Sequence, residues 1–343
     1  MISPIEGLSF PLPAPPRPGT TIEVSPGVHW LTTALPGRPR AINLWLLQDA
    51  GGWAMVDCGF PLAAAREQIE AVWSATLGKL PLTRLIVTHH HPDHVGNCRW
   101  VCDRWGIRPM MTESEHGLAT IVMGPGWAEW SALRGAFWQR HGLPERTAAE
   151  FHRHRSHYRD LYAPLPESWE QIRDGEAISI GGCTWEIMVA QGHTPGQALL
   201  YSPQRRLLIC GDQILPRTTP NVSVSGDPPT NPLALFLQSN ERIARTCGEA
   251  LVLPSHNLPF FGLHARIQAL RRLRQERLAK IEDELKPEPV TAAALIPALF
   301  GNLYDAETGF AMGEVLAQLQ YLVEQGRAER VTRDGKVYFT RAG

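Results

Sequence analysis

Residues Thr88–Gly96 read Thr-His-His-His-Pro-Asp-His-Val-Gly, so four histidines and one aspartate lie within the six positions from His89 to His94. The preceding residues, Arg84–Val87, end in a short apolar, β-branched run that is typical of a buried strand. The cluster therefore lies where a strand ends and a loop begins, which is where α/β folds place their chemistry. Imidazole nitrogen and carboxylate oxygen are good ligands for divalent ions and are costly to bury without partners. This loop predicts a metal site rather than a solvated polar turn.

The composition is that of an ordinary globular protein. At 343 residues the chain has room for one large domain and one smaller domain. Apolar residues make up 43% and charged residues 20%, and the formal net charge is −1, so no global field attracts nucleic acid or anionic lipid. The six cysteines form no Cys-x-x-Cys pair and are interpreted as small buried hydrophobic residues in a reducing compartment. Without a long apolar stretch or a signal-peptide pattern, we expect a cytoplasmic protein with no membrane partner.

The first third of the chain is expected to form an extended arm followed by an antiparallel meander. Residues 1–20 contain six prolines, which remove backbone hydrogen-bond donors and favour an extended arm. Apolar spacing predicts helices over Leu62–Leu77 and Val95–Trp105. The expected strands, which are separated by turn residues, are Ile22–Val24, Val28–Thr32, Asn43–Gln48, Trp53–Asp57 and residues 84–88.

Residues 104–175 are unusually rich in tryptophan and histidine and predict two or three helices. One interpretation is a cap over the metal site, whose aromatic side chains line an apolar substrate pocket. The candidate residues for that pocket are Trp127, Trp130 and Trp138. The other interpretation is a helical subdomain that packs its own aromatic residues, with a homodimer interface as one use of its surface. Three further histidines are interspersed with arginines and are expected to be solvated rather than metal-bound. They are His152, His154 and His157.

After this insertion the sequence returns to short strands and then changes character near residue 264. The expected strands are Ala177–Ile180, Thr184–Val189, Ala198–Tyr201, Leu207–Cys210 and Leu251–Pro254, and a helix is expected at Pro232–Arg245. A long basic helix over residues 265–285 follows, and then helical segments at Thr291–Phe300 and Gly313–Glu324. A hairpin is predicted from strands at Glu329–Thr332 and Lys336–Thr340. Helices followed by a hairpin are typical of a small winged helix-turn-helix domain.

One loop supplies too few side chains to fill two metal coordination shells, so further ligands are expected at later strand ends. His193, Asp212 and His256 each lie just after an apolar run and are bordered by glycine or proline. Each is a metal-ligand residue type, and the three occupy equivalent positions after successive strands. Asp57 also ends a strand, where its carboxylate can either reach the backbone amides of a neighbouring loop or serve only the turn.

The set Thr88-His89-x-His91-x-Asp93-His94, with the three distal residues, resembles the ordered motifs of the metallo-β-lactamase superfamily. The resemblance covers about residues 20–264 and implies an α+β fold, an αββα sandwich with the metal site at one edge. It divides the chain into an N-terminal arm (1–20), a catalytic domain (21–264) that carries the helical insertion, and a C-terminal domain (265–343). The last part resembles the winged-helix-like extension of the lactamase-β-like-2 branch, which includes endoribonucleases and uncharacterised bacterial hydrolases.

The resemblance also implies two metal ions that share one bridging carboxylate. The ligands of the first ion would be His89, His91 and His193. Those of the second would be Asp93, His94 and His256. The bridging carboxylate would be Asp212. Asp57 matches the family's first motif and would support the ligands without binding metal itself.

Two divalent ions about 3.5–4 Å apart can hold a bridging water and lower its pKa towards 7, which gives a hydroxide nucleophile without a serine or cysteine. We therefore expect a dinuclear metal-dependent hydrolase in which Asp93 either accepts or passes the proton of that water or serves only as a ligand. Zinc is the first expectation for the metals, with iron, manganese or nickel as alternatives. The Trp-rich insertion and the near-neutral net charge favour a small-molecule ester, thioester or lactone as the substrate.

An endoribonuclease-like phosphodiesterase that acts on single-stranded RNA is the first alternative, because the helix over residues 266–280 is basic. The same helix can instead be amphipathic, with its apolar residues inward and its arginines outward, so nucleic acid is not the favoured partner. The apolar residues are Ile267, Leu270, Leu273 and Leu278.

The second alternative is a mononuclear iron enzyme of the persulfide dioxygenase type. Such an enzyme would use only His89, His193 and Asp212 and would leave the other ligand residues free of metal. His91 stands where the flavodiiron branch has an acidic residue, which argues against that branch. A transcriptional regulator, inferred from the C-terminal segment alone, would leave the ligand set without a purpose.

Overall fold

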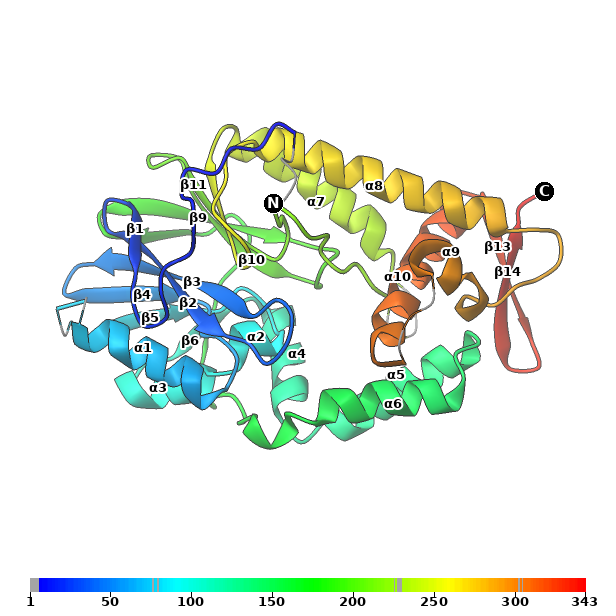
Figure 1. Cartoon of the computed structure of the whole chain (residues 1–343), viewed down its shortest axis with the longest axis horizontal. Helices are drawn as coiled ribbons and strands as arrows, with labels where there is room; N and C mark the ends of the chain where they lie inside the picture. Colours follow the sequence, from blue (N-terminus) through cyan, green and yellow to red (C-terminus); the bar gives the residue numbers. More distant parts are fainter. Residues whose placement is uncertain are drawn as a thin grey trace.

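The computed structural model describes residues 6–343 except residues 76, 79, 225, 227–229, 302 and 304. Within this described part, the chain forms two large β-sheets and one small two-stranded sheet. The two large sheets lie face to face, and helices cover the outer side of each sheet (Figure 1). The α+β, αββα sandwich expected from the sequence is therefore confirmed.

The first sheet has its described strands in the order β1-β2-β3-β4-β5-β6-β7, antiparallel as far as β4 and parallel from β4 onward. These strands are β1 (Ile22–Ser25), β2 (Val28–Ala34), β3 (Ala41–Asp49), β4 (Gly52–Val56), β5 (Leu82–Ile86), β6 (Pro109–Met111) and β7 (Glu170–Gln171). The sequence analysis predicted only helices where β6 and β7 lie. Strands of three and two residues are too short for an alternating pattern to reveal them.

The second sheet has the order β12-β11-β10-β9-β8 and is antiparallel except for the parallel pair β11 and β12. Its strands are β8 (Ala177–Ile180), β9 (Cys183–Ala190), β10 (Gln197–Ser202), β11 (Leu207–Gly211) and β12 (Leu251–Pro254). They agree with the predicted strands to within one residue at each end. The apolar runs that define them are buried, which is why the sequence pattern was informative.

Three hydrophobic cores hold these layers together. The core between the two sheets contains Trp30, Trp45 and Trp185, and the rings of the first two stack with their centroids 6.0 Å apart. A second core lies between the first sheet and its helices α1 (Ala63–Ala75) and α3 (Cys98–Trp105). A third core lies between the second sheet, helices α7 (Pro232–Cys247) and α8 (Leu263–Glu284), and the C-terminal segment. The sequence predicted one helix at Val95–Trp105. In the structure the short helix α2 (Pro92–Val95) ends just before Gly96, and α3 then begins at Cys98.

The insertion contains three helices, of which the first lies beside α2 and the other two lie beneath the C-terminal segment in the view of Figure 1. They are α4 (Glu113–Met123), α5 (Trp127–Arg140) and α6 (Glu145–Ser156), and the short 3₁₀ helix η1 (Arg159–Leu161) follows. Helix α6 packs against α10 of the C-terminal segment, where the rings of Phe151 and Phe310 lie 5.4 Å apart. The insertion and the C-terminal segment therefore form one continuous structure beside the sandwich.

After α8 the C-terminal segment continues with η2 (Ala293–Leu295), α9 (Ile296–Phe300), α10 (Asp305–Glu324), β13 (Ala328–Arg333) and β14 (Lys336–Arg341). Helix α10 begins well before Gly313, where the sequence predicted its start. Gly309 and Gly313 lower the helix propensity there, but a Cβ at either position would lie within 2.9 Å of Phe151 or Ser223. The helix therefore uses glycine for close packing. Among the described residues, no helix is long and apolar enough to cross a membrane.

The amphipathic interpretation of α8 needs one correction. Ile267, Leu270 and Leu278 are buried as expected, but two arginines also point inward. Arg266 is 8% exposed and Arg274 is fully buried, so the arginines do not all lie on the outer face. A buried guanidinium needs partners that a helical pattern cannot show, because these partners come from elsewhere in the chain.

Candidate metal centre

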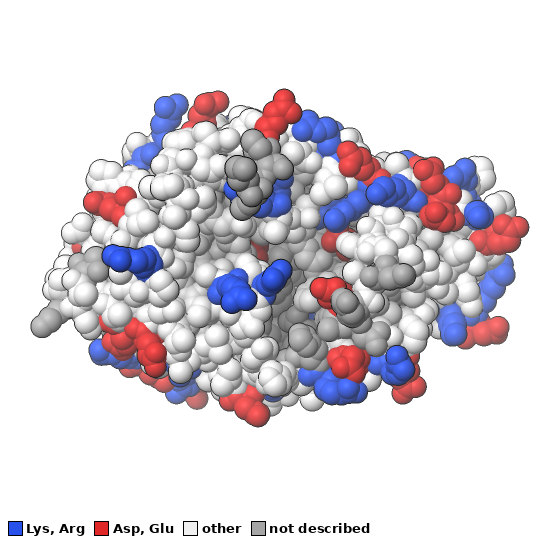
Figure 2. Space-filling model, in the orientation of Figure 1, with Lys and Arg blue, Asp and Glu red and all other residues white. Residues whose placement is uncertain are grey.

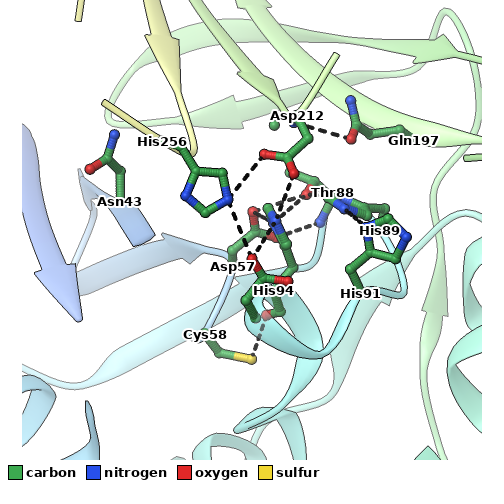
Figure 3. A network of polar contacts seen from close by, with 12 residues as sticks. Asn43, Asp57, Cys58, Thr88, His89, His91, His94, Gln197, Asp212 and His256 are labelled. Atoms are coloured by element: carbon green, nitrogen blue, oxygen red, sulfur yellow. Dashed lines mark hydrogen bonds and ion pairs between the residues drawn. The ribbon is translucent and has the colours of Figure 1, made fainter. Parts of the chain in front are cut away.

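The ligand residues singled out from the sequence all follow the ends of strands. In the close-up, the labelled ligand residues of the His89–His94 loop lie beside Asp212 and His256 (Figure 3). The loop with His89 to His94 follows β5 of the first sheet. His193 follows β9, Asp212 follows β11 and His256 follows β12, all in the second sheet. The site is therefore assembled from both sheets, and it lies at the junction between them.

The structure brings these seven side chains together in two adjacent groups. Within each group the potential ligand atoms all lie within 4.8 Å of one another. The first group is His89, His91, His193 and Asp212. The second group is Asp93, His94 and His256. This division matches the ligand sets that the family resemblance implied.

Asp212 lies between the two groups and faces both. Its Oδ2 atom lies 3.7 Å from Nε2 of His193 and 3.6 Å from Nε2 of His94. Its Oδ1 atom lies 3.6 Å from Nε2 of His256. In the second group, Oδ2 of Asp93 lies 3.3 Å from Nε2 of His256 and 3.8 Å from Nε2 of His94. Asp212 is thus placed to contact cations in both groups.

The residues present fit divalent cations. Nε2 of His94, Nε2 of His193 and Oδ1 of Asp212 are buried and have no hydrogen-bond partner within the described structure. Buried polar atoms without hydrogen-bond partners are costly, and one cation in each group would satisfy them. The donor set of imidazole nitrogen and carboxylate oxygen suits zinc and similar metals.

The electrostatics of the two groups differ. Burial and the neighbouring imidazoles hold the pKa of His89 and of His91 well below the usual value, so both rings are neutral ligands. Burial alone would also lower the pKa of His94, but the carboxylates of Asp57, Asp93 and Asp212 raise it well above the usual value. In the absence of metal His94 is therefore protonated, and a cation would take the place of that proton.

Asp57 orients the ring of His94. Its Oδ1 atom accepts the backbone N–H of Thr88 at 2.7 Å, and its Oδ2 atom accepts Oγ1–H of Thr88 at 2.9 Å. Oδ2 also lies 2.7 Å from Nδ1 of His94, which directs Nε2 towards the other ligands. Asp57 has a φ of 62°, a left-handed conformation that aspartate and asparagine tolerate better than most residues. The carboxylate thus serves the neighbouring loop as well as the turn.

Glu115 is a supporting residue that the sequence analysis missed. It lies in α4, is fully buried, and its Oε2 accepts from the backbone N–H of His90 at 3.0 Å and lies 2.6 Å from Nδ1 of the same ring. Its Oε1 accepts the backbone N–H of Gly196 at 2.7 Å. Glu115 therefore connects the loop that carries His89 to the loop that carries His193. No local signal marks it, because an acidic residue in the first turn of a helix is ordinary.

A cavity of about 420 Å³ opens beside the first group of ligands. Its lining includes His91 and His193. It also includes Trp130, Trp138 and Phe151 from the insertion, and Arg134, whose guanidinium lies over those three rings. The third tryptophan singled out from the sequence, Trp127, packs in the core under the first sheet. The insertion therefore contributes both to the core and to the lining of the cavity.

The three histidines expected to be solvated have different surroundings. The Nδ1 atom of His152 lies 2.5 Å from Oγ of Ser131, and the ring is only partly exposed, so this ring is held within the insertion. His157 is exposed beside Tyr158. The side chain of His154 lies outside the described residues.

The chain is similar in sequence and in structure to known proteins. The family profile described as "Metallo-beta-lactamase superfamily" matches residues 37–256. A second profile, "Metallo-beta-lactamase-like, C-terminal domain", matches residues 278–342. The first profile covers most of the sandwich together with the insertion, and the second begins within α8 and covers the rest of the C-terminal segment.

Individual proteins show the same relationship. A beta-lactamase domain protein from Burkholderia ambifaria is 37% identical, with a TM-score of 0.88 and 98% of each chain covered. The probable metallo-hydrolase YqjP from Bacillus subtilis is 22% identical over 83% of this chain and 89% of its own length. A hydroxyacylglutathione hydrolase from Pseudomonas aeruginosa is 28% identical over 50% of this chain and 46% of its own length.

Proposed function

We propose that this chain, which belongs to the metallo-beta-lactamase superfamily and is a metal-dependent hydrolase, cleaves an ester, thioester or lactone with an apolar acyl group at a site for two divalent cations. The observation that carries the proposal is the pair of ligand groups joined by Asp212 beside a cavity with an aromatic wall. Zinc is the first choice for both cations because the donor set is imidazole and carboxylate.

The division of labour among the residues follows from their positions. His89, His91 and His193 would hold one cation, Asp93, His94 and His256 the other, and Asp212 would contact both. Two bound divalent cations lower the pKa of water and polarise the carbonyl group under attack. In this proposal Asp93, whose side chain is 25% exposed, accepts the proton of the attacking water on a carboxylate oxygen.

Among the three substrate classes, a thioester has additional support from the comparisons. The substrate in the name hydroxyacylglutathione hydrolase is a thioester of glutathione, and that protein matches half of this chain. The cavity adds Trp130, Trp138 and Phe151, which favour an acyl group with a large apolar surface. We therefore place the acyl group against the aromatic wall and the carbonyl group beside the ligand groups.

Removing bound metal should abolish this activity. Because the cations supply both the activated water and the polarisation of the carbonyl group, hydrolysis of an acyl thioester should fall by at least about a hundredfold after dialysis against a chelator. Metal content is measured by mass spectrometry beside the assay, and zinc, manganese, iron and nickel are added back separately. Thioester hydrolysis that survives complete metal loss would contradict the proposal.

Trp130→Ala should change which acyl chains are preferred. The substitution removes an aromatic surface from the cavity wall, so kcat/KM for a medium-length acyl thioester should fall by about tenfold while longer chains lose less. Leu133→Ala in the same helix is the matched control, because that side chain is 65% exposed. An equal loss for every chain length would show that Trp130 does not contact the acyl group.

The two alternative functions have less support. Arg266 and Arg274 are buried, which removes two cations from the basic surface that RNA would need. In Figure 2 the side chains of lysine and arginine alternate with those of aspartate and glutamate over the visible face. A mononuclear iron site would leave Asp93, His94 and His256 without a metal to bind, although His94 Nε2 is buried and has no hydrogen-bond partner among the described atoms.

A further inference from the structure

The segment over residues 215–224, which follows β11, borders the metal site and holds one of its ligands. The carbonyl oxygen of Asn221 lies 2.8 Å from Nδ1 of His193, and both Asn221 and Ser223 line the cavity. Because a carbonyl oxygen can only accept, this contact places a proton on Nδ1 and leaves the lone pair of Nε2 facing the site. The position of Asn221 therefore decides the orientation and the tautomer of this ring.

Two arginines of α8 hold the 215–224 segment from its other side. Arg266 donates to the carbonyl oxygens of Leu215 and Thr218 at 2.6 and 2.7 Å, near the start of the segment. Arg274 donates from Nη2 to the carbonyl oxygen of Pro220 at 2.6 Å, immediately before the carbonyl that orients the histidine ring. The segment also donates one backbone N–H to α10, at Gly313. The path of the segment is thus set by the C-terminal part of the chain.

Arg274 also supports His193 from its backbone side. The guanidinium lies over the ring of Phe236 in α7, 5.4 Å from the ring centroid. Phe236 is fully buried and packs directly against Gly192, where an added Cβ would lie 2.4 Å from Cβ of Phe236. Gly192 directly precedes His193, so Phe236 supports the backbone of this histidine, while the 215–224 segment holds its ring. The guanidinium of Arg274 contacts both Phe236 and that segment.

The surroundings of Arg274 argue for a positional role. Its side chain is fully buried and forms an ion pair with Glu314 in α10, a carboxylate that it shares with Arg277. Ion pairs buried this completely add little net stability compared with well-packed apolar side chains. A guanidinium offers instead a rigid planar group that can hold a carbonyl oxygen, a carboxylate and an aromatic ring at the same time.

We propose that Arg274 is a positioning residue for His193, and that the C-terminal domain completes the metal site through it. By holding the 215–224 segment and Phe236, Arg274 keeps the ring in the single orientation and tautomer in which Nε2 can bind a cation. The inference rests on the proposed function in one respect, namely that His193 is a metal ligand. It assigns the C-terminal domain a role in positioning His193, and this role does not involve nucleic acid.

The test compares Arg274→Met and Arg274→Lys with Arg271→Met, an exposed position on the same helix that serves as the matched control. Because Arg277 also pairs with Glu314, the carboxylate keeps a partner when Arg274 is replaced. Zinc affinity is measured by competition with a chelating dye in the full-length protein. We expect the affinity for one of the two zinc ions to fall by at least about tenfold in both Arg274 variants and to stay unchanged in the control.

A second measurement does not depend on metal. Nitrogen NMR of the imidazole groups in the metal-free protein should show His193 as a single tautomer with its proton on Nδ1, and a mixture of tautomers in Arg274→Lys. A zinc affinity and a His193 tautomer that stay unchanged in folded Arg274 variants would overturn the inference. If the wild-type protein bound no zinc, the proposed function would fail, while the NMR result would still decide the role of Arg274.

A third variant covers the case in which Arg274→Met does not fold. Pro220→Gly loosens the 215–224 segment and leaves the pair of Arg274 and Glu314 in place. We expect the same loss of zinc affinity and the same mixture of tautomers. Unchanged values in both Pro220→Gly and Arg274→Lys would show that the segment does not control His193.

Discussion

Replacing Asp212 with alanine should lower kcat/KM for the preferred thioester by at least about a thousandfold, which corresponds to about 4 kcal/mol of transition-state stabilisation. Asp212 faces both ligand groups, because its Oδ2 lies near His193 of the first group and His94 of the second, and its Oδ1 lies near His256 of the second. Its loss should weaken the binding of both cations, whereas the loss of any other ligand should weaken one.

The measurement pairs steady-state kinetics with metal analysis of the purified variant. Asp103→Ala is a suitable control, because Asp103 lies in α3 and its side chain is 61% exposed. Circular dichroism establishes that the Asp212 variant is folded. Alanine retains the backbone N–H that donates to Gln197, so the substitution removes only the carboxylate. A folded variant that retains two metal ions and more than a tenth of the activity would refute the bridging role.

Replacing Asp57 with asparagine should lower the affinity of the second cation by about a hundredfold, although Asp57 does not face the cations itself. The left-handed backbone at residue 57 accommodates asparagine, so the substitution changes chemistry rather than conformation. Both carboxylate oxygens of Asp57 accept hydrogen bonds. Oδ1 accepts from the backbone N–H of Thr88, and Oδ2 accepts from the Thr88 hydroxyl and from Nδ1 of His94. An amide must therefore place its NH₂ group against one of these donors.

The Asp57→Asn substitution would weaken binding of the second cation by changing the tautomer of His94. If the amide nitrogen faces Nδ1, the ring must accept there and carry its proton on Nε2, which can then no longer bind a cation. Zinc titration should show one tight and one weakened ion per chain in Asp57→Asn, and kcat should fall together with the second ion. Asp103→Asn is the control. Equal affinity for both ions in a folded variant would mean that the ring keeps its orientation without the carboxylate.

The fold and the clustering of the seven candidate ligands were predictable because both depend on local patterns. These residues lie at the ends of buried strands, and such strands are visible as apolar runs, so the sequence pointed to each of the seven side chains that the structure brings together. The short strands β6 and β7 were missed because two or three residues give no alternating pattern. The start of α10 was missed because its glycines serve close packing.

The residues that support the ligands were not predictable from local patterns. Glu115 acts on a loop more than eighty residues away at Gly196, and Arg274 acts on Pro220 from a helix whose spacing suggested an outer basic face. Such contacts depend on which elements the fold brings together, and an ordinary acidic or basic residue in a helix carries no mark of them. The supporting contacts of Glu115 and Arg274 therefore became visible only in the three-dimensional structure.

The junction position of the site has a further consequence for the lifetime of the native state. One ligand loop belongs to the first sheet, and the other three ligand segments belong to the second. Cations held there would tie the two layers to each other, much as a disulfide ties two segments. The layers could then part only after the ions dissociate, so metal loading would slow global unfolding and protect the tryptophan-rich interface between the sheets from proteases.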